Sequence, residues 1–492
     1  MTRGHFERKA AMTDATSTPD THESTHVETL VIGFGKAGKS LAVQLAKAGR
    51  QVTLIEQSSR MYGGTCINIG CVPTKTLVHS ADVRREAPSS PSPEEFYASA
   101  VERKETLREK MNAANLAMVE TPGATVVTGR ARFVGERTVE VTAGEDRLRI
   151  TADNVVIGTG ATPRLPSIEG LPENPLEDPR VVTSTELIDR TELPRRLAIL
   201  GSGFIGLEFA SMYSGFGSEV TVIGREDRLA PREDEAASEA IAELLEKQGV
   251  ALKLGRTLES VSAGDDGGPL TLNLAGGDSA ERVEADVLLI SAGRIPATEG
   301  LGLAEAGVET DESGAVVVDS LLRTSAPGVW AVGDVKGGPQ FTYVSFDDFR
   351  ILKDQLLAGK GESGRTTEDR GPVPSTTFLT PPFSRVGLTE REARERAADE
   401  GWDVAVARKK VAELAAMPRP KALGQTDGFY QVVVDKTSGR ILGATLFAVD
   451  SQEVINLVTM AMKHDLPYTA LRDAIYTHPS SSEGLNELLA GI

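Results

Sequence analysis

Two cysteines, Cys66 and Cys71, are the residues best suited to redox chemistry, and the 492-residue chain contains no others. Only four residues separate them. A disulfide that serves stability usually closes a long loop, because a long loop constrains the unfolded chain more. In a cytosolic protein, a pair this close is more often catalytic or metal-binding than structural.

The cysteine pair lies where a helix is expected to begin, within the run Gly63–Lys75. A helix N-terminus favours the thiolate form and lowers the thiol pKa. Lys75, about one turn further on, adds positive charge nearby. Residues five apart do not face each other in a regular helix, so a disulfide between Cys66 and Cys71 requires a distorted helix start. Two helices are expected here, at roughly 73–86 and 93–119.

A glycine-rich loop precedes the cysteines. Its three glycines come after a buried strand that begins at Glu28, and a second strand at 51–55 ends in Glu56. Free N–H groups and the helix dipole at such a loop favour a pyrophosphate, and the carboxylate can accept hydrogen bonds from ribose hydroxyls. The alternative is a glycine-rich turn beside a surface glutamate. The pattern favours a nucleotide with a free 2′-OH, FAD or NAD, bound by Gly33, Gly35, Gly38 and Glu56.

The same strand–loop–helix pattern recurs at 196–206, and two such openings are far more informative than one. Here the second strand, 220–223, ends in Gly224-Arg225 without a carboxylate. An arginine beside a missing acid is the arrangement that accommodates a 2′-phosphate, which favours NADPH over NADH. Alternatively, Arg225 is only solvated and Glu226 contacts the ribose. The loop glycines are Gly201, Gly203 and Gly206.

Composition limits the partners. The net charge of -18 disfavours nucleic acid and anionic membranes, and no apolar run is long enough for a transmembrane helix. The first 26 residues are polar and lack the apolar stretch of a secretory signal. We expect residues 1–26 to be a disordered extension, in which Met12 could be the true start, and we expect a cytoplasmic location.

The rest of the sequence predicts further strands, and the arrangement of the predicted elements changes near Pro372. The strands 154–157, 286–291 and 329–332 each run into a glycine-containing turn. After Pro372, strands alternate with helices as in a separate α+β domain. Further strands are expected near 124–128, 138–142, 147–150, 375–378, 404–408, 429–435 and 441–447, and further helices near 389–399, 451–464 and 468–475.

Together with Ala331–Asp334 and Thr477–Glu483, these motifs make the sequence resemble the class I pyridine nucleotide–disulfide oxidoreductases, which include lipoamide dehydrogenase, glutathione reductase and mercuric reductase. The resemblance covers nearly everything from Val27 onward. It implies an α/β fold with two doubly wound, Rossmann-like dinucleotide-binding domains and a C-terminal α+β dimerisation domain. The expected division is an FAD domain at 27–175 and 293–370, an NAD(P)H domain at 176–292, and a dimerisation domain at 371–492.

The resemblance also implies a role for individual residues. Cys71 would lie over the flavin as the charge-transfer thiolate, and Cys66 would be the interchange thiol. Lys75 and Glu208 would form an ion pair beside the flavin, and Phe204 would be the aromatic gate of the nicotinamide pocket. Further FAD residues would be Gly64, Thr65, Thr159, Gly160, Gly333 and Asp334, and the NAD(P)H set would include Arg225 and Gly293.

His478 and Glu483 resemble the family's general acid–base dyad. A thiolate leaving group needs a proton, which a histidine can give and take at neutral pH, and a carboxylate on its other nitrogen fixes the tautomer. In this family the dyad comes from the other subunit, which implies a homodimer with the pair supplied in trans.

The absence of further cysteines narrows the choice of electron acceptor. No cysteine comes after Cys71, unlike in mercuric reductases and high-molecular-weight thioredoxin reductases. The stretches 31–39, 61–66, 341–348 and 379–385 resemble a bacterial flavin reductase group associated with reactive-chlorine resistance and copper(II) reduction. No structural metal is expected; copper would contact Cys66 and Cys71 only transiently, as a substrate.

Two alternatives to oxidant or copper defence stay open. One is reduction of a small organic disulfide, such as a low-molecular-weight thiol dimer or a lipoamide. The other is a flavin redox sensor without turnover. The presence of His478 and Glu483 argues against a sensor, because a sensor does not need a proton-transferring dyad.

Overall fold

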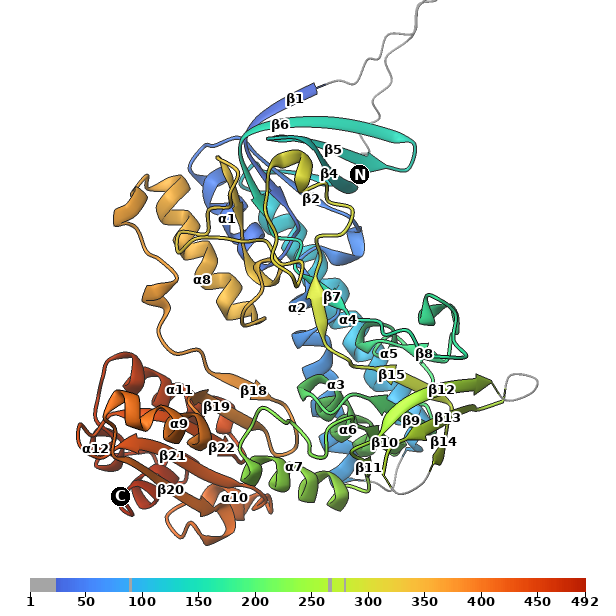
Figure 1. Cartoon of the computed structure of the whole chain (residues 1–492). Coiled ribbons are helices and arrows are strands. Elements are labelled where there is room, and N and C mark those ends of the chain that lie inside the picture. Colours follow the sequence, from blue (N-terminus) through green and yellow to red (C-terminus); the bar gives the residue numbers. More distant parts are fainter. Residues whose placement is uncertain (1–23, 88–90, 264–267, 278–279) are drawn as a thin grey trace, which may run out of the picture.

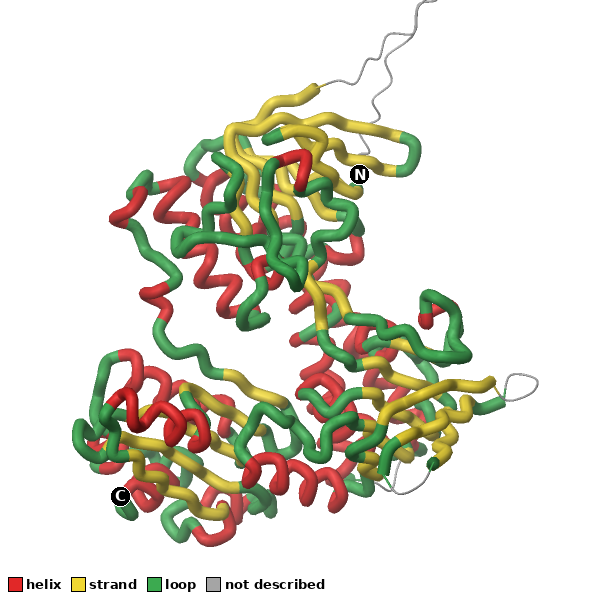
Figure 2. Tube along the Cα trace, in the orientation of Figure 1, coloured by secondary structure: helices red, strands yellow, loops and turns green. Residues whose placement is uncertain are grey.

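The computed structural model describes residues 24–87, 91–263, 268–277 and 280–492, and it is built around two mainly parallel sheets and an antiparallel C-terminal sheet (Figures 1 and 2). Of the extension predicted to be disordered, residues 24–26 begin strand β1 (Ser24–Ile32), and the rest lies outside the described residues. Among the described helices, none combines the length and apolar character needed to cross a membrane.

The first sheet has the strand order β3-β2-β1-β6-β5-β4, with β17 paired to β6. One long strand, β6, replaces the two strands predicted at 147–150 and 154–157, because its first half pairs with β5 and its second half with β17. The strands after β1 are β2 (Val52–Glu56), β3 (Thr125–Thr128), β4 (Arg130–Gly135), β5 (Thr138–Ala143), β6 (Asp146–Ile157) and β17 (Val329–Ala331).

Two helices far apart in the chain cover one face of this sheet. Helix α1 (Lys36–Lys47) comes after β1, and α8 (Thr342–Leu352) lies beside it (Figure 1). Leu41 and Leu45 of α1 share a buried core with Phe349 and Leu352 of α8. This packing brings the segment after residue 333 next to the first glycine loop.

Helices α2 (Thr65–Asn68), α3 (Cys71–Glu86) and α4 (Pro93–Glu120) lead from the first sheet to the second. The helices predicted at 73–86 and 93–119 are therefore confirmed. Helix α4 begins with a capping box at Ser92 and is tied to α6 (Phe204–Phe216) by a 2.9 Å hydrogen bond between the hydroxyls of Tyr97 and Tyr213.

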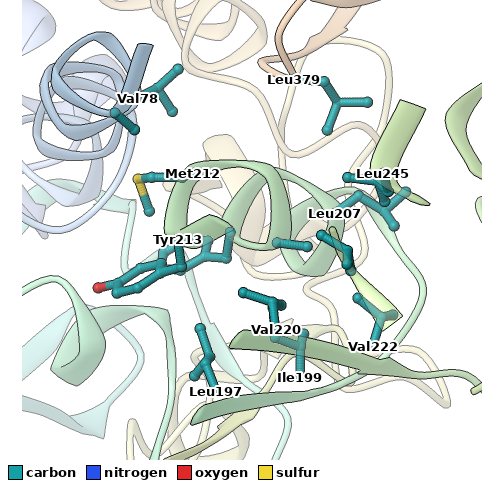
Figure 3. Packing of buried hydrophobic residues seen from close by; sticks show 14 of the residues in the cluster. Val78, Leu197, Ile199, Leu207, Met212, Tyr213, Val220, Val222, Leu245 and Leu379 are labelled. Carbon is teal, nitrogen blue, oxygen red and sulfur yellow. The ribbon is translucent and has the colours of Figure 1, made fainter. Parts of the chain in front are cut away.

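The second sheet is parallel, with the order β11-β10-β9-β15-β8, and β9 (Arg196–Leu200), α6 and β10 (Glu219–Ile223) repeat the arrangement of β1, α1 and β2. Figure 3 shows Ile199, Leu207 and Val222 from these three elements packed in one core. Other elements here are β8 (Val181–Val182), α5 (Ser184–Leu187), α7 (Glu235–Lys247), β11 (Ala251–Lys253), β15 (Val287–Ile290) and an unpredicted antiparallel sheet of β12 (Thr257–Ala263), β13 (Leu270–Ala275) and β14 (Glu281–Ala285).

A short antiparallel ladder connects the two parts where the chain leaves the first sheet and returns to it. Strand β7 (Ala161–Pro163) pairs with β16 (Arg294–Pro296), and the amide of Arg164 donates to the carbonyl of Gly293 at 2.9 Å. The chain then rejoins the first sheet through β17 and reaches a single turn at Gly333–Lys336.

The C-terminal part is an antiparallel sheet with the order β18-β19-β22-β21-β20 and its own core, so the predicted α/β fold class with a final α+β domain is confirmed. Its elements are β18 (Ser375–Thr377), β19 (Phe383–Gly387), α9 (Glu390–Glu400), β20 (Val404–Lys410), α10 (Pro418–Ala422), β21 (Phe429–Asp435), β22 (Ile441–Phe447), α11 (Ser451–Lys463), α12 (Tyr468–Arg472) and α13 (Gly484–Leu489).

Candidate active site

The two cysteines lie on either side of a break between two helices. Their separation in sequence predicted such a distortion, because a disulfide between them cannot form within one regular helix. Helix α2 ends at Asn68, Ile69 and Gly70 leave the helical path, and α3 begins at Cys71. Both cysteines are free thiols, and both line a cavity of about 870 Å³. The break therefore separates Cys66 on one short helix from Cys71 at the N-terminus of a 16-residue helix.

The surroundings favour a thiolate on Cys71. A hydrogen bond donated by the Cys66 thiol lowers the pKa of Cys71 to about 6, with help from the Thr342 hydroxyl and the charge of Lys75. The Thr342 oxygen lies 3.6 Å from the Cys71 sulfur. The same hydrogen bond, together with burial, raises the pKa of Cys66. The pair is thus set up to hold one negative charge, on Cys71.

Lys75 and Glu208 form an ion pair beside the dithiol, with Nζ and Oε1 2.6 Å apart. The backbone amide of Phe378 donates to the same Glu208 oxygen at 3.1 Å. The Lys75 ammonium also lies 4.6 Å from the centre of the Phe378 ring. The pair connects α3 to α6 at the cavity wall.

The first glycine loop forms another wall of the cavity. Gly33 has φ +103°, and a Cβ there would meet the Gly158 carbonyl oxygen at 2.3 Å. A Cβ on Gly38 would meet the Gly33 oxygen at 2.7 Å, and one on Gly64 would meet Cα of Gly35 at 2.7 Å. Side chains at these positions would fill the backbone cradle that a pyrophosphate needs.

Glu56 ends β2 at the edge of this cradle. Its two oxygens accept hydrogen bonds from the amides of Phe34 (3.0 Å) and Ser58 (3.3 Å). Burial raises the pKa of Glu56, and these amides oppose the shift. The carboxylate lines the cavity, where it can accept further hydrogen bonds from a ribose.

Asp334 also lines the cavity, in the turn after β17. Burial raises the pKa of Asp334, while the charges of Arg294 and Lys336 lower it. Thr65, Thr159, Gly160 and Gly333 line the same cavity. A side-chain-free backbone cradle flanked by the buried carboxylate of Glu56 and the partly buried carboxylate of Asp334 fits FAD, which carries a pyrophosphate between two hydroxyl-bearing chains.

The second glycine loop repeats the backbone geometry of the first. Gly201 has φ +124°, and a Cβ there would meet the Ser291 carbonyl oxygen at 2.6 Å. A Cβ on Gly206 would meet the Gly201 oxygen at 2.5 Å, and Gly203 caps α6. Phe204 begins α6, lines the cavity, and stacks on Phe383 with ring centres 6.2 Å apart.

At the end of β10, Gly224 is buried and Arg225 is 82% exposed at its side chain. The guanidinium of Arg225 pairs with Glu226, with Nη2 and Oε1 3.0 Å apart. Gly293 has φ +101° and belongs to the connecting ladder; it is not among the residues that line the large cavity.

His478 and Glu483 form the predicted pair: Nδ1 lies 2.9 Å from Oε1, and the amide of Ser480 donates to the second oxygen at 2.8 Å. Although burial acts in the opposite direction, the hydrogen bonds from His478 and Ser480 lower the pKa of Glu483. The imidazole is 72% exposed. Neither residue lines the cavity that holds the cysteines, so the described part of one chain does not bring dyad and dithiol together.

Two neighbours of the dithiol were not predicted. Thr342 lies 271 positions from Cys71, so no local spacing could reveal their contact. Lys39 is buried at 6% exposure, where burial lowers its pKa to about 8. In the sequence, Lys39 looks like any surface lysine of a helix. The only signal that could have singled it out is its place in the first helical turn after the glycine loop.

Comparison with known proteins adds independent evidence. The sequence model described as "Pyridine nucleotide-disulphide oxidoreductase" matches residues 27–348. The model of the same family's dimerisation domain matches residues 373–489. Together the two models span most of the chain.

Similar curated proteins include the probable pyridine nucleotide-disulfide oxidoreductase RclA of Escherichia coli, 45% identical over 94% of this chain and 98% of that protein. A mercuric reductase of Lysinibacillus sphaericus is 33% identical over 93% of this chain and 81% of its own. The solved Cu(II) complex of the HOCl-induced flavoprotein disulfide reductase RclA from E. coli is similar with a TM-score of 0.86 and 43% identity, over 95% of this chain and 100% of that one.

Proposed function

This chain belongs to the pyridine nucleotide-disulphide oxidoreductase family and is an oxidoreductase, and from that premise we propose that it uses FAD and NADPH to reduce its Cys66–Cys71 disulfide and then passes the electrons to an oxidant or to copper(II). One observation carries the proposal: a single cavity is lined by the first glycine loop, both cysteines and Phe204 of the second loop. Nucleotide site and dithiol are therefore contiguous.

The cofactor would be held by the backbone of the first loop, by Glu56 and by Asp334. When bound, FAD accepts an electron pair from the reduced nicotinamide and makes it available to the disulfide. The Lys75–Glu208 pair fixes a cation at the cavity wall, and Phe204, at the start of α6, lines the cavity next to the second loop.

In the proposed reductive step the Cys66–Cys71 bond takes up two electrons and one proton. This yields a thiolate on Cys71, favoured by its helix N-terminus and by Thr342, and a thiol on Cys66. In the oxidative step the pair gives up two electrons and the one proton held by Cys66, and the disulfide re-forms. Two copper(II) ions would become two copper(I) with release of that proton, or one organic disulfide would take up the electrons, that proton and a second proton from the acid–base dyad or solvent and become two thiols.

The two acceptor classes place different demands on the acid–base dyad. An organic disulfide releases a thiolate that must be protonated, whereas copper(II) reduction has no such leaving group. His478, exposed and fixed by Glu483, favours the organic disulfide as second candidate. We propose copper or oxidant reduction first, because the similar E. coli protein is described as HOCl-induced and was solved as a Cu(II) complex.

A comparison of acceptors tests this choice. NADPH oxidation is followed anaerobically with copper(II) and, separately, with a small organic disulfide, using the wild type, Cys66→Ser and His478→Gln. We expect Cys66→Ser to abolish both reactions, and His478→Gln to slow only disulfide reduction, by about 100-fold. If copper reduction persists in Cys66→Ser, the dithiol is not the electron donor to copper.

The exposed dyad leads us to propose a homodimer in which each His478 serves the partner's dithiol. Mixed dimers of a Cys71→Ser chain and a His478→Gln chain test this arrangement with disulfide as acceptor. Supply in trans predicts one intact site and about half of wild-type activity. Supply in cis predicts no intact site.

We further propose a cytoplasmic location, where a reduced dithiol persists. Recovery of the protein in a periplasmic fraction would contradict this location.

A further inference from the structure

Lys39 is a buried cation without a carboxylate partner among the described residues. Its ammonium donates to the carbonyl oxygen of Gly63 at 3.2 Å and to the side-chain oxygen of Asn115 at 2.5 Å. Both acceptors are neutral. An ammonium removed from water normally requires a nearby negative charge, because hydrogen bonds to neutral groups replace only part of its hydration.

Among the described residues, the group that can supply that charge is Cys66, at the moment when its thiol gives up its proton. Lys39 contacts the carbonyl of Gly63, three positions before Cys66, and the charges of Lys39 and Cys66 interact favourably. Within the described part of the chain, no other anion counteracts the burial of Lys39; the other charge acting on it is Lys36, which repels it.

The surrounding contacts hold this arrangement in place. Asn68 donates to the carbonyls of Tyr62 and Gly64, both at 3.0 Å, and accepts from Asn112 of α4 at 3.0 Å. Asn115 lies one turn further along α4 and orients Lys39. The segment 62–68, which includes the short helix α2 with Cys66, is therefore held by the side chains of three asparagines and one lysine, and Lys39 is the charged member of this group.

We propose that Lys39 is a buried counter-charge that stabilises the negative charge on the Cys66 sulfur whenever that thiol acts as a nucleophile. The inference rests on the proposed function, in which Cys66 attacks the acceptor. Cys71 has its own stabilising groups, Lys75 and Thr342. Each sulfur would thus have a separate lysine: Lys75, which lines the cavity, for Cys71, and the buried Lys39 of α1, which does not line it, for Cys66.

A purely structural role for Lys39 is the competing explanation, and two substitutions separate the two. Lys39→Met removes the charge and both hydrogen bonds. Asn115→Asp keeps the lysine and an acceptor for it but neutralises its charge with a carboxylate. A structural role predicts damage from the first substitution only, whereas a counter-charge predicts the same effect from both.

The test measures the reactivity of Cys66 itself. In a Cys71→Ser background Cys66 is the only cysteine, so its alkylation by iodoacetamide at pH 7.5 can be followed by mass spectrometry on the flavin-loaded protein. We expect Lys39→Met and Asn115→Asp each to slow alkylation by about 10-fold, as a shift of one pKa unit implies. Lys47→Met, at an exposed position of the same helix, should change nothing.

An unchanged alkylation rate in both variants, with circular dichroism and flavin content preserved, would overturn the proposal. So would a loss in Lys39→Met that Asn115→Asp does not share. The measurement involves no turnover and no acceptor. Failure of the proposed function would instead appear as wild-type protein whose disulfide is not reduced by NADPH, so the two failures are distinguishable.

Discussion

The two glycine loops of this chain have the same backbone conformation and differ in the residues at the end of the strand that follows each loop. In each loop, the first glycine takes a positive φ against the carbonyl of the residue that follows a neighbouring strand, and the third packs on the first. After the first loop comes a buried carboxylate, Glu56; after the second comes Gly224 and an exposed arginine. A buried carboxylate suits a cofactor that stays bound, whereas an exposed arginine suits a nucleotide that enters and leaves at every turnover.

Breaking the first loop should have the largest effect. Gly33→Ala places a Cβ 2.3 Å from the Gly158 oxygen at a φ that alanine rarely adopts. We expect the purified protein to carry about a tenth of its flavin or less, measured as the ratio of visible to ultraviolet absorbance. Flavin at the wild-type level would contradict the assignment of this loop to FAD.

The matched change in the second loop should spare the flavin. Gly201→Ala creates a similar clash, 2.6 Å from the Ser291 oxygen. We expect the protein to stay yellow while flavin reduction by NADPH slows about 100-fold, because strain of ~3 kcal/mol falls on nucleotide binding. The check is stopped-flow absorbance; loss of flavin in both variants would show that the loops do not serve separate ligands.

Glu56→Gln tests the acid that distinguishes the loops. The amide keeps an oxygen for Phe34 N–H but loses the charge-assisted hydrogen bonds, which contribute ~1.5–3 kcal/mol. We expect flavin to dissociate about 10-fold more readily, measured by fluorescence after dilution. Glu28→Gln, in the middle of β1, is the matched control and should retain flavin.

Arg225→Ala should have the smallest effect, because the side chain is largely exposed. If Arg225 contacts the 2′-phosphate, KM should rise about 5-fold for NADPH, as about 1 kcal/mol from an exposed charge implies, and stay unchanged for NADH. Arg195→Ala, also 82% exposed, serves as control. Equal changes with both nucleotides would instead favour Glu226 as the ribose partner.

The sequence predicted those parts of the site that depend on local geometry. A loop that needs a positive φ requires glycine, so Gly33 and Gly201 are visible in the sequence, and the spacing of Cys66 and Cys71 predicted the helix break. Long-range contacts left no such signal: Thr342 reaches Cys71 because α8 packs on α1, and Lys39 looks like any helical lysine until its burial is known. The sheet of β12, β13 and β14 was missed because its strands carry few β-branched or aromatic residues.

The most direct test of the central claim, that NADPH electrons reach the Cys66–Cys71 pair, is an anaerobic titration of the flavin-loaded protein with NADPH, followed by absorbance between pH 5 and 8. We predict a long-wavelength charge-transfer band that is absent in Cys71→Ser. Because the pKa of Cys71 is lowered to about 6, the thiolate and the band should persist above that pH and fade as the pH falls through it. Bleaching of the flavin without this band in the wild type would contradict the account.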